Sequence, residues 1–160
     1  MSREGSPRTT EFQIRRIGPE DRDAWQALFT AYGVFYETDF SPAVLDGVWA
    51  WLMDAAHEVS ALVAELDGTD RPTLVGFAHL RRLRDTFTAG PAWSLDDLYV
   101  AQDHRGAGVA RALIAACETT AHAEGGGTLR WITASENSTA QRLYDTVATR
   151  TTWVTYEKET

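Results

Sequence analysis

A glycine-rich turn between a strand-like and a helix-like segment is the first place where the residue types predict chemistry. From Leu98 to Arg111 the chain reads Leu-Tyr-Val-Ala-Gln-Asp-His-Arg-Gly-Ala-Gly-Val-Ala-Arg. Gly106 and Gly108 carry no side chain that would block an anion, and the free N–H groups at the start of a helix attract negative charge. A pyrophosphate would fit at this turn, whereas a tight turn that serves packing alone is the alternative.

Two better-known phosphate-binding patterns do not match this turn. A P-loop requires Lys followed by Ser or Thr after its last glycine, but Val109 and Ala110 follow Gly108. A dinucleotide-binding fingerprint requires a small residue where Arg111 stands, and it normally opens the first strand–helix–strand unit of a domain. The His, Cys, Asp and Glu residues have no spacing typical of a metal site, so no metal is expected.

A second motif, Asn137-x-x-Ala140-x-x-Leu143-Tyr144, follows later in the chain. Together with Arg105-Gly106-Ala107-Gly108-Val109-Ala110, it makes the chain resemble the GNAT superfamily of acyl-CoA-dependent N-acetyltransferases. The strand Leu95-Asp96-Asp97-Leu98-Tyr99-Val100 looks like that of polyamine acetyltransferases, and residues 25–36 look like histone and polyamine acetyltransferase relatives. The resemblance implies an α/β fold in three layers, in which about four helices flank a mixed, mostly antiparallel sheet.

The resemblance also implies that acetyl-CoA binds along the turn and leaves as CoA. Backbone groups of Leu98 and Val100 would pair with the pantetheine arm, and Asn137 would contact the cofactor from the other side. Tyr144 matches the family tyrosine near the thioester sulfur. Residues 149–153 replace the Gly-Phe usual in the family, so the floor of the acceptor pocket is expected to differ. Amides of the turn and the helix start would hold the pyrophosphate: Arg105, Gly106, Ala107, Gly108, Val109, Ala110 and Arg111.

Acetylation of an amine requires an uncharged nitrogen, yet an alkyl ammonium with a pKa near 10.4 is almost fully protonated at pH 7. Asp96 corresponds to the glutamate of the polyamine acetyltransferases, so it is expected to attract the ammonium and accept its proton through a water. Asp97 could share this role, and His79 is the rival base. The alternative roles are hydrogen bonding to loop amides for the two aspartates and packing for His79. Tyr144 is expected to donate a hydrogen bond to the departing thiolate, or else to pack in the core.

The acceptor is expected to be a primary amine: a small polyamine-like or amino-acid-like molecule, or the lysine side chain of a protein. Tyr36, Glu37 and Asp97 are expected to bind it, because aromatic faces and carboxylates suit a cation. Tyr32, Phe35 and Asp39 lie in the same stretch, although its aromatic residues could equally form the buried face of a helix. Cys117 is expected to be inert core, so attack is direct, within a ternary complex. The alternative function is a non-catalytic module that binds acyl-CoA as a sensor.

Composition excludes several other classes of function. The 160 residues are 44% hydrophobic, which predicts a single domain over residues 11–160 behind a disordered tail at 1–10. With 15 basic and 23 acidic residues the net charge is −8, which disfavours nucleic acid and anionic membrane surfaces as partners. The apolar runs are shorter than the ~18 residues of a membrane span. A single cysteine indicates a cytoplasmic protein, and the resemblance implies a homodimer.

Hydrophobic periodicity predicts the elements that position these residues. The expected order is β α α β β β α β α β, a mixed α/β sheet. Strands are predicted at 12–17, 59–66, 73–83, 93–100, 129–133 and 153–157, and helices at 25–36, 42–52, 109–121 and 140–147.

Overall fold

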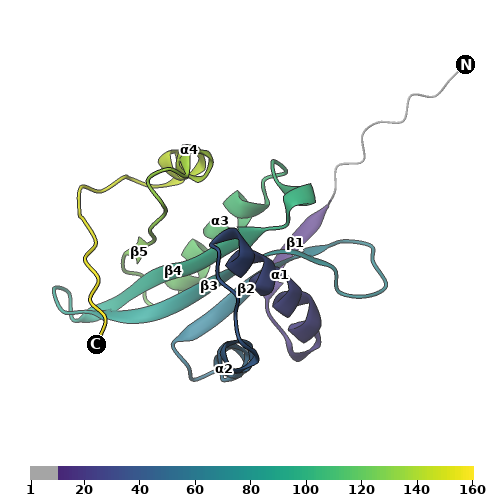
Figure 1. The fold of residues 1–160 in the computed structure, drawn as a ribbon. Coiled ribbons are helices and arrows are strands. Elements are labelled where there is room, and N and C mark those ends of the chain that lie inside the picture. The colour runs from purple at the N-terminus through teal and green to yellow at the C-terminus, as the bar shows by residue number, and fades with distance from the viewer. Residues whose placement is uncertain (1–10) are drawn as a thin grey trace, which may run out of the picture.

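A computed structural model describes residues 11–160, and the tail expected at 1–10 lies outside them. None of its helices is both long and apolar enough to cross a membrane. Two 3-10 turns accompany the main helices and strands (Figure 1), and the elements in chain order are β1 Phe12–Arg16, η1 Pro19–Asp21, α1 Arg22–Phe35, α2 Pro42–Met53, β2 Val59–Leu66, β3 Leu74–Asp85, β4 Gly90–Val100, η2 Gln102–His104, α3 Val109–Ala123, β5 Leu129–Arg130 and α4 Ser138–Val147.

The five strands form one sheet in chain order, β1-β2-β3-β4-β5. The first four pair antiparallel, and only β4 and β5 run parallel. That parallel pairing is short, since it joins Trp93 to Leu129 and Ser94 to Arg130. The remainder of β4, up to Val100, therefore has an edge that β5 does not cover.

Alternating side chains of the sheet enter two hydrophobic cores, one on each face. Phe77 packs with Trp25 of α1 and with residues of α2, whereas Ala78 packs with Leu113 of α3. Helices α1 and α2 accordingly cover one face and α3 covers the other (Figure 1). Trp25, Phe77 and Leu113 are completely buried. The three-layer α/β architecture predicted from the sequence is thus confirmed.

Short polar side chains set the starts of two helices. The Ser41 hydroxyl accepts a hydrogen bond from the Val44 N–H at 3.3 Å, and Pro42 occupies the first turn of α2, where its missing N–H costs nothing. Asn137 plays the capping role for α4, because its side-chain oxygen accepts from the Ala140 N–H at 3.2 Å. Helix α2 thus begins at Pro42, as expected, and α4 begins at Ser138, two residues before the expected start.

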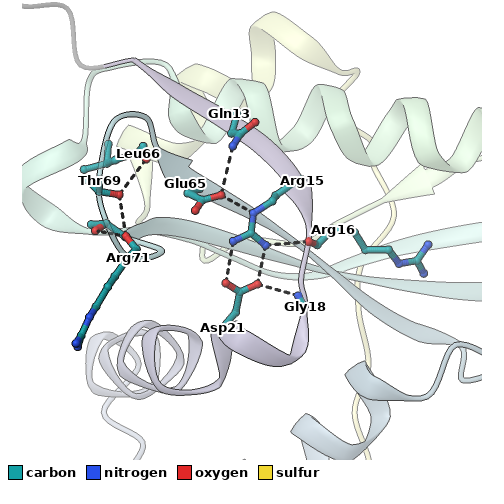
Figure 2. Close-up of polar contacts among 10 residues, drawn as sticks. Gln13, Arg15, Arg16, Gly18, Asp21, Glu65, Leu66, Thr69 and Arg71 are labelled. Carbon is teal, nitrogen blue, oxygen red and sulfur yellow. Dashed lines mark hydrogen bonds and ion pairs between the residues drawn. The ribbon is translucent and has the colours of Figure 1, made fainter.

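A partly buried ion-pair cluster links β1 and β2 to the turn that precedes α1 (Figure 2). Two guanidinium nitrogens of Arg15 donate to Asp21 at 2.7 and 2.8 Å, and the Arg15 Nε donates to Glu65. The Gly18 N–H also donates to Asp21, at 2.8 Å. Burial raises the pKa of Asp21, but these hydrogen bonds outweigh burial and hold it below its ordinary value.

The C-terminal part of the sheet differs from expectation. The strand predicted at 129–133 ends at Arg130, and the strand predicted at 153–157 is wrong, because residues 148–160 have no regular secondary structure. A strand needs a neighbouring edge to complete its hydrogen bonds. Within residues 11–160, no strand pairs with this segment. Its apolar side chains are consequently exposed, with Trp153 at 87% and Tyr156 at 90%.

Candidate active site

A cavity of about 610 Å³ opens where β4, the glycine turn and α3 meet α4 and the end of α1. It brings together most of the residues that the two sequence motifs single out. The predicted site residues that line it are Tyr36, Leu98, Val100, Arg105, Gly106, Gly108, Val109, Ala110, Arg111, Asn137 and Tyr144. Ala107, Glu37, Asp96 and Asp97 are not among its lining residues.

One wall of the cavity is the uncovered edge of β4. The Ala101 N–H donates to the Val75 carbonyl of β3 at 2.8 Å. Because peptide groups alternate in direction along a strand, those of Leu98 and Val100 point away from β3. The Val100 carbonyl meets the Arg105 guanidinium there, with Nε at 3.0 Å. An extended chain laid along this edge would find backbone donors and acceptors at the spacing of a strand.

The glycine turn forms the second wall. Gly106 and Gly108 have φ angles of +77° and +83°, a conformation that favours glycine, and a Cβ at either would meet no atom within 4 Å. Gly108 precedes the first turn of α3, and within residues 11–160 no side chain caps that turn. Its N–H groups and helix dipole are therefore available to an anion. Arg105 and Arg111 add positive charge at the same cavity.

Helix α4 supplies the opposite wall. The oxygen of Asn137 is engaged in capping, which leaves its amide N–H groups for a ligand. Tyr144 packs edge-on against Trp131, with ring centroids 5.5 Å apart. Burial raises the pKa of the Tyr144 phenol, and the nearby Tyr36 contributes in the same direction. A phenol that keeps its proton is suited to donating a hydrogen bond.

The two adjacent aspartates of β4 lie in different environments because the strand contains a β-bulge. Where β3 pairs with β4, Leu80 lies opposite Leu95 and His79 lies opposite Asp97. Asp96 is therefore an extra residue on β4 that has no partner on β3. Two Arg81 nitrogens donate to the Asp96 carboxylate at 2.6 and 3.0 Å. Asp96 also lines a small cavity of about 30 Å³ together with Tyr36 and Tyr144. The structure thus places Asp96 near Tyr144 but in an ion pair.

The bulge turns Asp97 toward α1, where it meets His79. The His79 Nδ1 lies 2.8 Å from an Asp97 oxygen, and the Trp25 indole N–H donates to the His79 Nε2 at 3.0 Å. His79 is only 2% exposed. Burial raises the pKa of Asp97, but the interaction with His79, above all its hydrogen bond, outweighs burial, so the pKa of Asp97 lies below its ordinary value.

Three further residues test the sequence-based assignments. Tyr36 lines both cavities, whereas Glu37 is exposed outside them. Cys117 is completely buried, as expected for an inert core thiol, and burial raises its pKa to about 12. Sequence reasoning did not assign a site role to Arg81 or Trp25. The contacts of Arg81 and Trp25 depend on the β-bulge and on the register between β3 and β4, and the spacing of hydrophobic residues in the sequence predicts neither of these features.

Comparisons with known proteins agree with this geometry. Residues 22–147 match the Acetyltransferase (GNAT) family. The D-amino-acid N-acetyltransferase HPA3 of Saccharomyces cerevisiae is 30% identical over 145 residues, 91% of this chain and 89% of the yeast protein. The ribosomal-protein-alanine N-acetyltransferase of Brucella melitensis biovar Abortus 2308 has a TM-score of 0.78 at 25% identity, covering 94% of this chain and all of that one. The aminoglycoside N-acetyltransferase AAC(6')-Iy, solved with CoA, shares the fold at 22% identity and a TM-score of 0.78, over 96% of this chain and 98% of its own.

Proposed function

Because the chain belongs to the acetyltransferase (GNAT) family, we propose that it transfers the acetyl group of acetyl-CoA to a primary amine by direct attack within a ternary complex. The cavity that joins the open edge of β4 to the uncapped start of α3 carries this proposal. It offers strand-like pairing at one end and an anion site at the other, which matches a long ligand with a pantetheine arm and a pyrophosphate.

The residues present fit this cofactor. Leu98 and Val100 would pair with the pantetheine arm, for which Arg105 would have to release the Val100 carbonyl. The amides from Arg105 to Arg111, including Ala107, would hold the pyrophosphate, and the Asn137 amide would donate from α4. When bound, acetyl-CoA supplies the activated thioester. The residues proposed to bind the cofactor are therefore the same ones that the two sequence motifs predict.

Two side chains are proposed to carry the chemical step. Tyr144 donates a hydrogen bond to the sulfur as negative charge develops there, a role that suits a half-buried phenol with a raised pKa. Asp96 receives the amine proton through a water, and Arg81 holds the carboxylate in place beside the small cavity. His79 is a poorer candidate for the base, because both of its ring nitrogens are already engaged in the core.

The acceptor is proposed to be a small amine of amino-acid-like or polyamine-like type, with a protein lysine as the alternative. The 30% identical yeast relative is named for acetylation of D-amino acids, which supports an amino-acid-like acceptor. Tyr36 and Asp97 are proposed to bind it, with Glu37 steering it from the surface. We also propose a homodimer, since the exposed apolar side chains of Phe87, Trp153 and Tyr156 would gain from burial between two copies.

The function is tested by replacing Gly108 with aspartate and, as a matched control, with asparagine. Both residues tolerate a positive φ to a similar degree, so only the aspartate adds a charge that repels phosphate. Calorimetry should show CoA binding at least about tenfold weaker in Gly108→Asp than in Gly108→Asn. Equal affinities would contradict the pyrophosphate site. CoA binding without acetylation of any amine in a broad panel would favour the sensor module over the enzyme.

A further inference from the structure

The side chain of Arg105 lies along the uncovered edge of β4, where its guanidinium contacts two different elements. Its Nε donates to the Val100 carbonyl at 3.0 Å. The guanidinium carbon lies 5.6 Å from the ring centroid of Tyr99 and 6.0 Å from that of Phe35, the last residue of α1. All four residues line the cavity of about 610 Å³. Arg105 thus connects the edge of β4 with the end of α1 at the wall of the cavity.

Each of these contacts is with a neutral group. Within residues 11–160, no carboxylate forms an ion pair with Arg105. A carbonyl and two aromatic faces hold a cation less strongly than a phosphate does, because a planar guanidinium can donate two parallel, charge-assisted hydrogen bonds to phosphate oxygens. The uncapped start of α3 opens into the same cavity. We therefore expect an anion bound at that helix start to draw Arg105 away from Val100.

The Val100 carbonyl is also a group that an extended ligand would need. The Ala101 N–H of the same peptide group donates to the Val75 carbonyl of β3, so the Val100 carbonyl points away from the sheet. An amide N–H of a pantetheine arm laid along β4 would have to donate to this oxygen. The Arg105 guanidinium lies on the same outer side of the edge. A ligand that brings only a neutral arm must therefore break the Arg105 contact, and it offers no anion in exchange.

We propose that Arg105 is a specificity-determining residue for the acyl donor. Its side chain occupies the edge of β4 until a pyrophosphate draws it away, so thioesters that carry a pyrophosphate bind well and pantetheine thioesters that lack one bind poorly. The inference rests on the proposed function and specifies the class of donor. The amides of the glycine turn could hold a phosphate without any movement of this side chain. Only the side chain makes access to the Val100 carbonyl depend on the phosphate.

Calorimetry measures how much the pantetheine arm adds to the affinity. CoA is compared with 3′-phosphoadenosine 5′-diphosphate, which has the same nucleotide and pyrophosphate but no arm. The ratio of the two dissociation constants, nucleotide over CoA, is the gain from the arm. Arg105→Met removes the guanidinium and has no N–H to offer Val100. It should weaken binding of the nucleotide about fivefold, because a phosphate ligand is lost, and raise the gain from the arm about fivefold, because the edge is free.

Two further variants separate the two roles of this side chain. Phe35→Leu removes one aromatic face and keeps the guanidinium, so affinity for the nucleotide should stay the same while the gain from the arm rises about threefold. Arg111 is the matched control, because it lines the same cavity but donates to the Thr146 hydroxyl of α4, at 2.9 Å. Arg111→Met should weaken the nucleotide and CoA equally and leave the gain from the arm unchanged.

An unchanged or smaller gain from the arm in Arg105→Met would overturn the inference. An equal rise in Arg111→Met would overturn it too, because the effect would then come from loss of positive charge in general. If Arg105→Met fails to fold, Phe35→Leu decides by the same criterion.

The proposed function and this inference can fail separately. The expected ratios without acetylation of any amine would contradict the proposed function and leave the inference standing. Acetyl transfer from acetyl-CoA with unchanged ratios would contradict the inference alone. Where transfer occurs, kcat/KM for S-acetylpantetheine relative to acetyl-CoA should rise about fivefold in Arg105→Met.

Discussion

Neighbouring aspartates can have unrelated roles when the backbone turns them to different sides of a sheet. Asp96 is the extra residue of the bulge and pairs with Arg81, whereas Asp97 faces His79 across the strand pair. In the sequence the two carboxylates are indistinguishable. A regular strand would also have placed them on opposite faces, but it would have turned Asp97 to the same face as Leu95, toward α3. The bulge reverses this assignment.

The Tyr144 hydroxyl is expected to contribute to the chemical step. Tyr144→Phe preserves the edge-on contact with Trp131, so acetyl-CoA affinity should change less than about twofold. Loss of a hydrogen-bond donor to the developing thiolate should lower kcat by about ten- to a hundredfold. Steady-state kinetics with calorimetry of CoA binding measures both effects. A full rate in this variant would assign Tyr144 to packing alone.

The proton-acceptor role proposed for Asp96 predicts a change in pH dependence. Because the free amine is the nucleophile, kcat/KM of the wild type should rise toward alkaline pH as the acceptor, with a pKa near 10.4, loses its proton, and Asp96→Asn should lower kcat/KM most at neutral pH, where removal of that proton is most demanding. Arg81→Gln is the informative companion, because it frees the carboxylate without removing it. An unaltered profile in Asp96→Asn, recorded from pH 5 to 10 with one amine, would transfer the role to solvent or to His79.

At the scale of elements, the site exists because β4 and β5 pair over only two positions and then diverge. The sequence predicted nearly every helix and strand that borders the resulting cavity. In long segments such as α1 and α3, the spacing of the apolar residues alone shows that the segment is a helix and which side of it is buried. The sequence did not predict how short β5 is, nor the bulge, nor the unpaired residues 153–157. These features depend on whether a neighbouring edge is available, which is decided by contacts between segments distant in the sequence.

The ion pair between Arg15 of β1 and Asp21, which precedes α1, is expected to make a pH-dependent contribution to stability. Asp21→Asn should lower the free energy of unfolding by about 2 kcal/mol at pH 7, because it leaves Arg15 with a weaker partner at a buried site. The pKa of Asp21 is lower when folded, below its ordinary 3.8, so this contribution is present above pH 3.8 and lost as pH falls through the folded value.

Urea unfolding of wild type and variant at several pH values measures this difference. The difference in free energy of unfolding between the wild type and Asp21→Asn should become smaller as the pH falls below about 3.8. Asp46→Asn removes a surface pair with Arg22 and should cost less than about 1 kcal/mol, which makes it a suitable control. A gap that stays constant from pH 7 to acid pH would contradict the assigned role of Asp21.

At the scale of the whole molecule, charge is divided between the two ends of the site. Arg105 and Arg111 line the cavity of about 610 Å³, whereas Glu37 and Asp39 are exposed near the end of α1. The net charge of −8 is therefore compatible with an anionic cofactor, because the cations gather where phosphate is expected.

This separation of charge predicts that salt lowers kcat/KM more for a cationic acceptor than for a neutral one. For a diamine acceptor, kcat/KM should fall as ionic strength increases, because the screening length shortens to about 8 Å near 0.15 M. A neutral arylamine measured with the same acetyl-CoA corrects for the effect of salt on the cofactor. Equal salt dependence for the two acceptors, or a preference for the arylamine, would contradict steering of cations while leaving acetyl transfer intact.

Because the one cysteine of the chain is buried, its reactivity can report how often helix α3 separates from the sheet. Cys117 lies in the core between α3 and the sheet, completely inaccessible, and its pKa of about 12 leaves almost no thiolate at neutral pH. A thiol-reactive dye can therefore label it only while α3 is detached from the sheet. Because CoA is proposed to bind at the first turn of that helix, the labelling rate in its presence would report how strongly cofactor binding holds the helix in place.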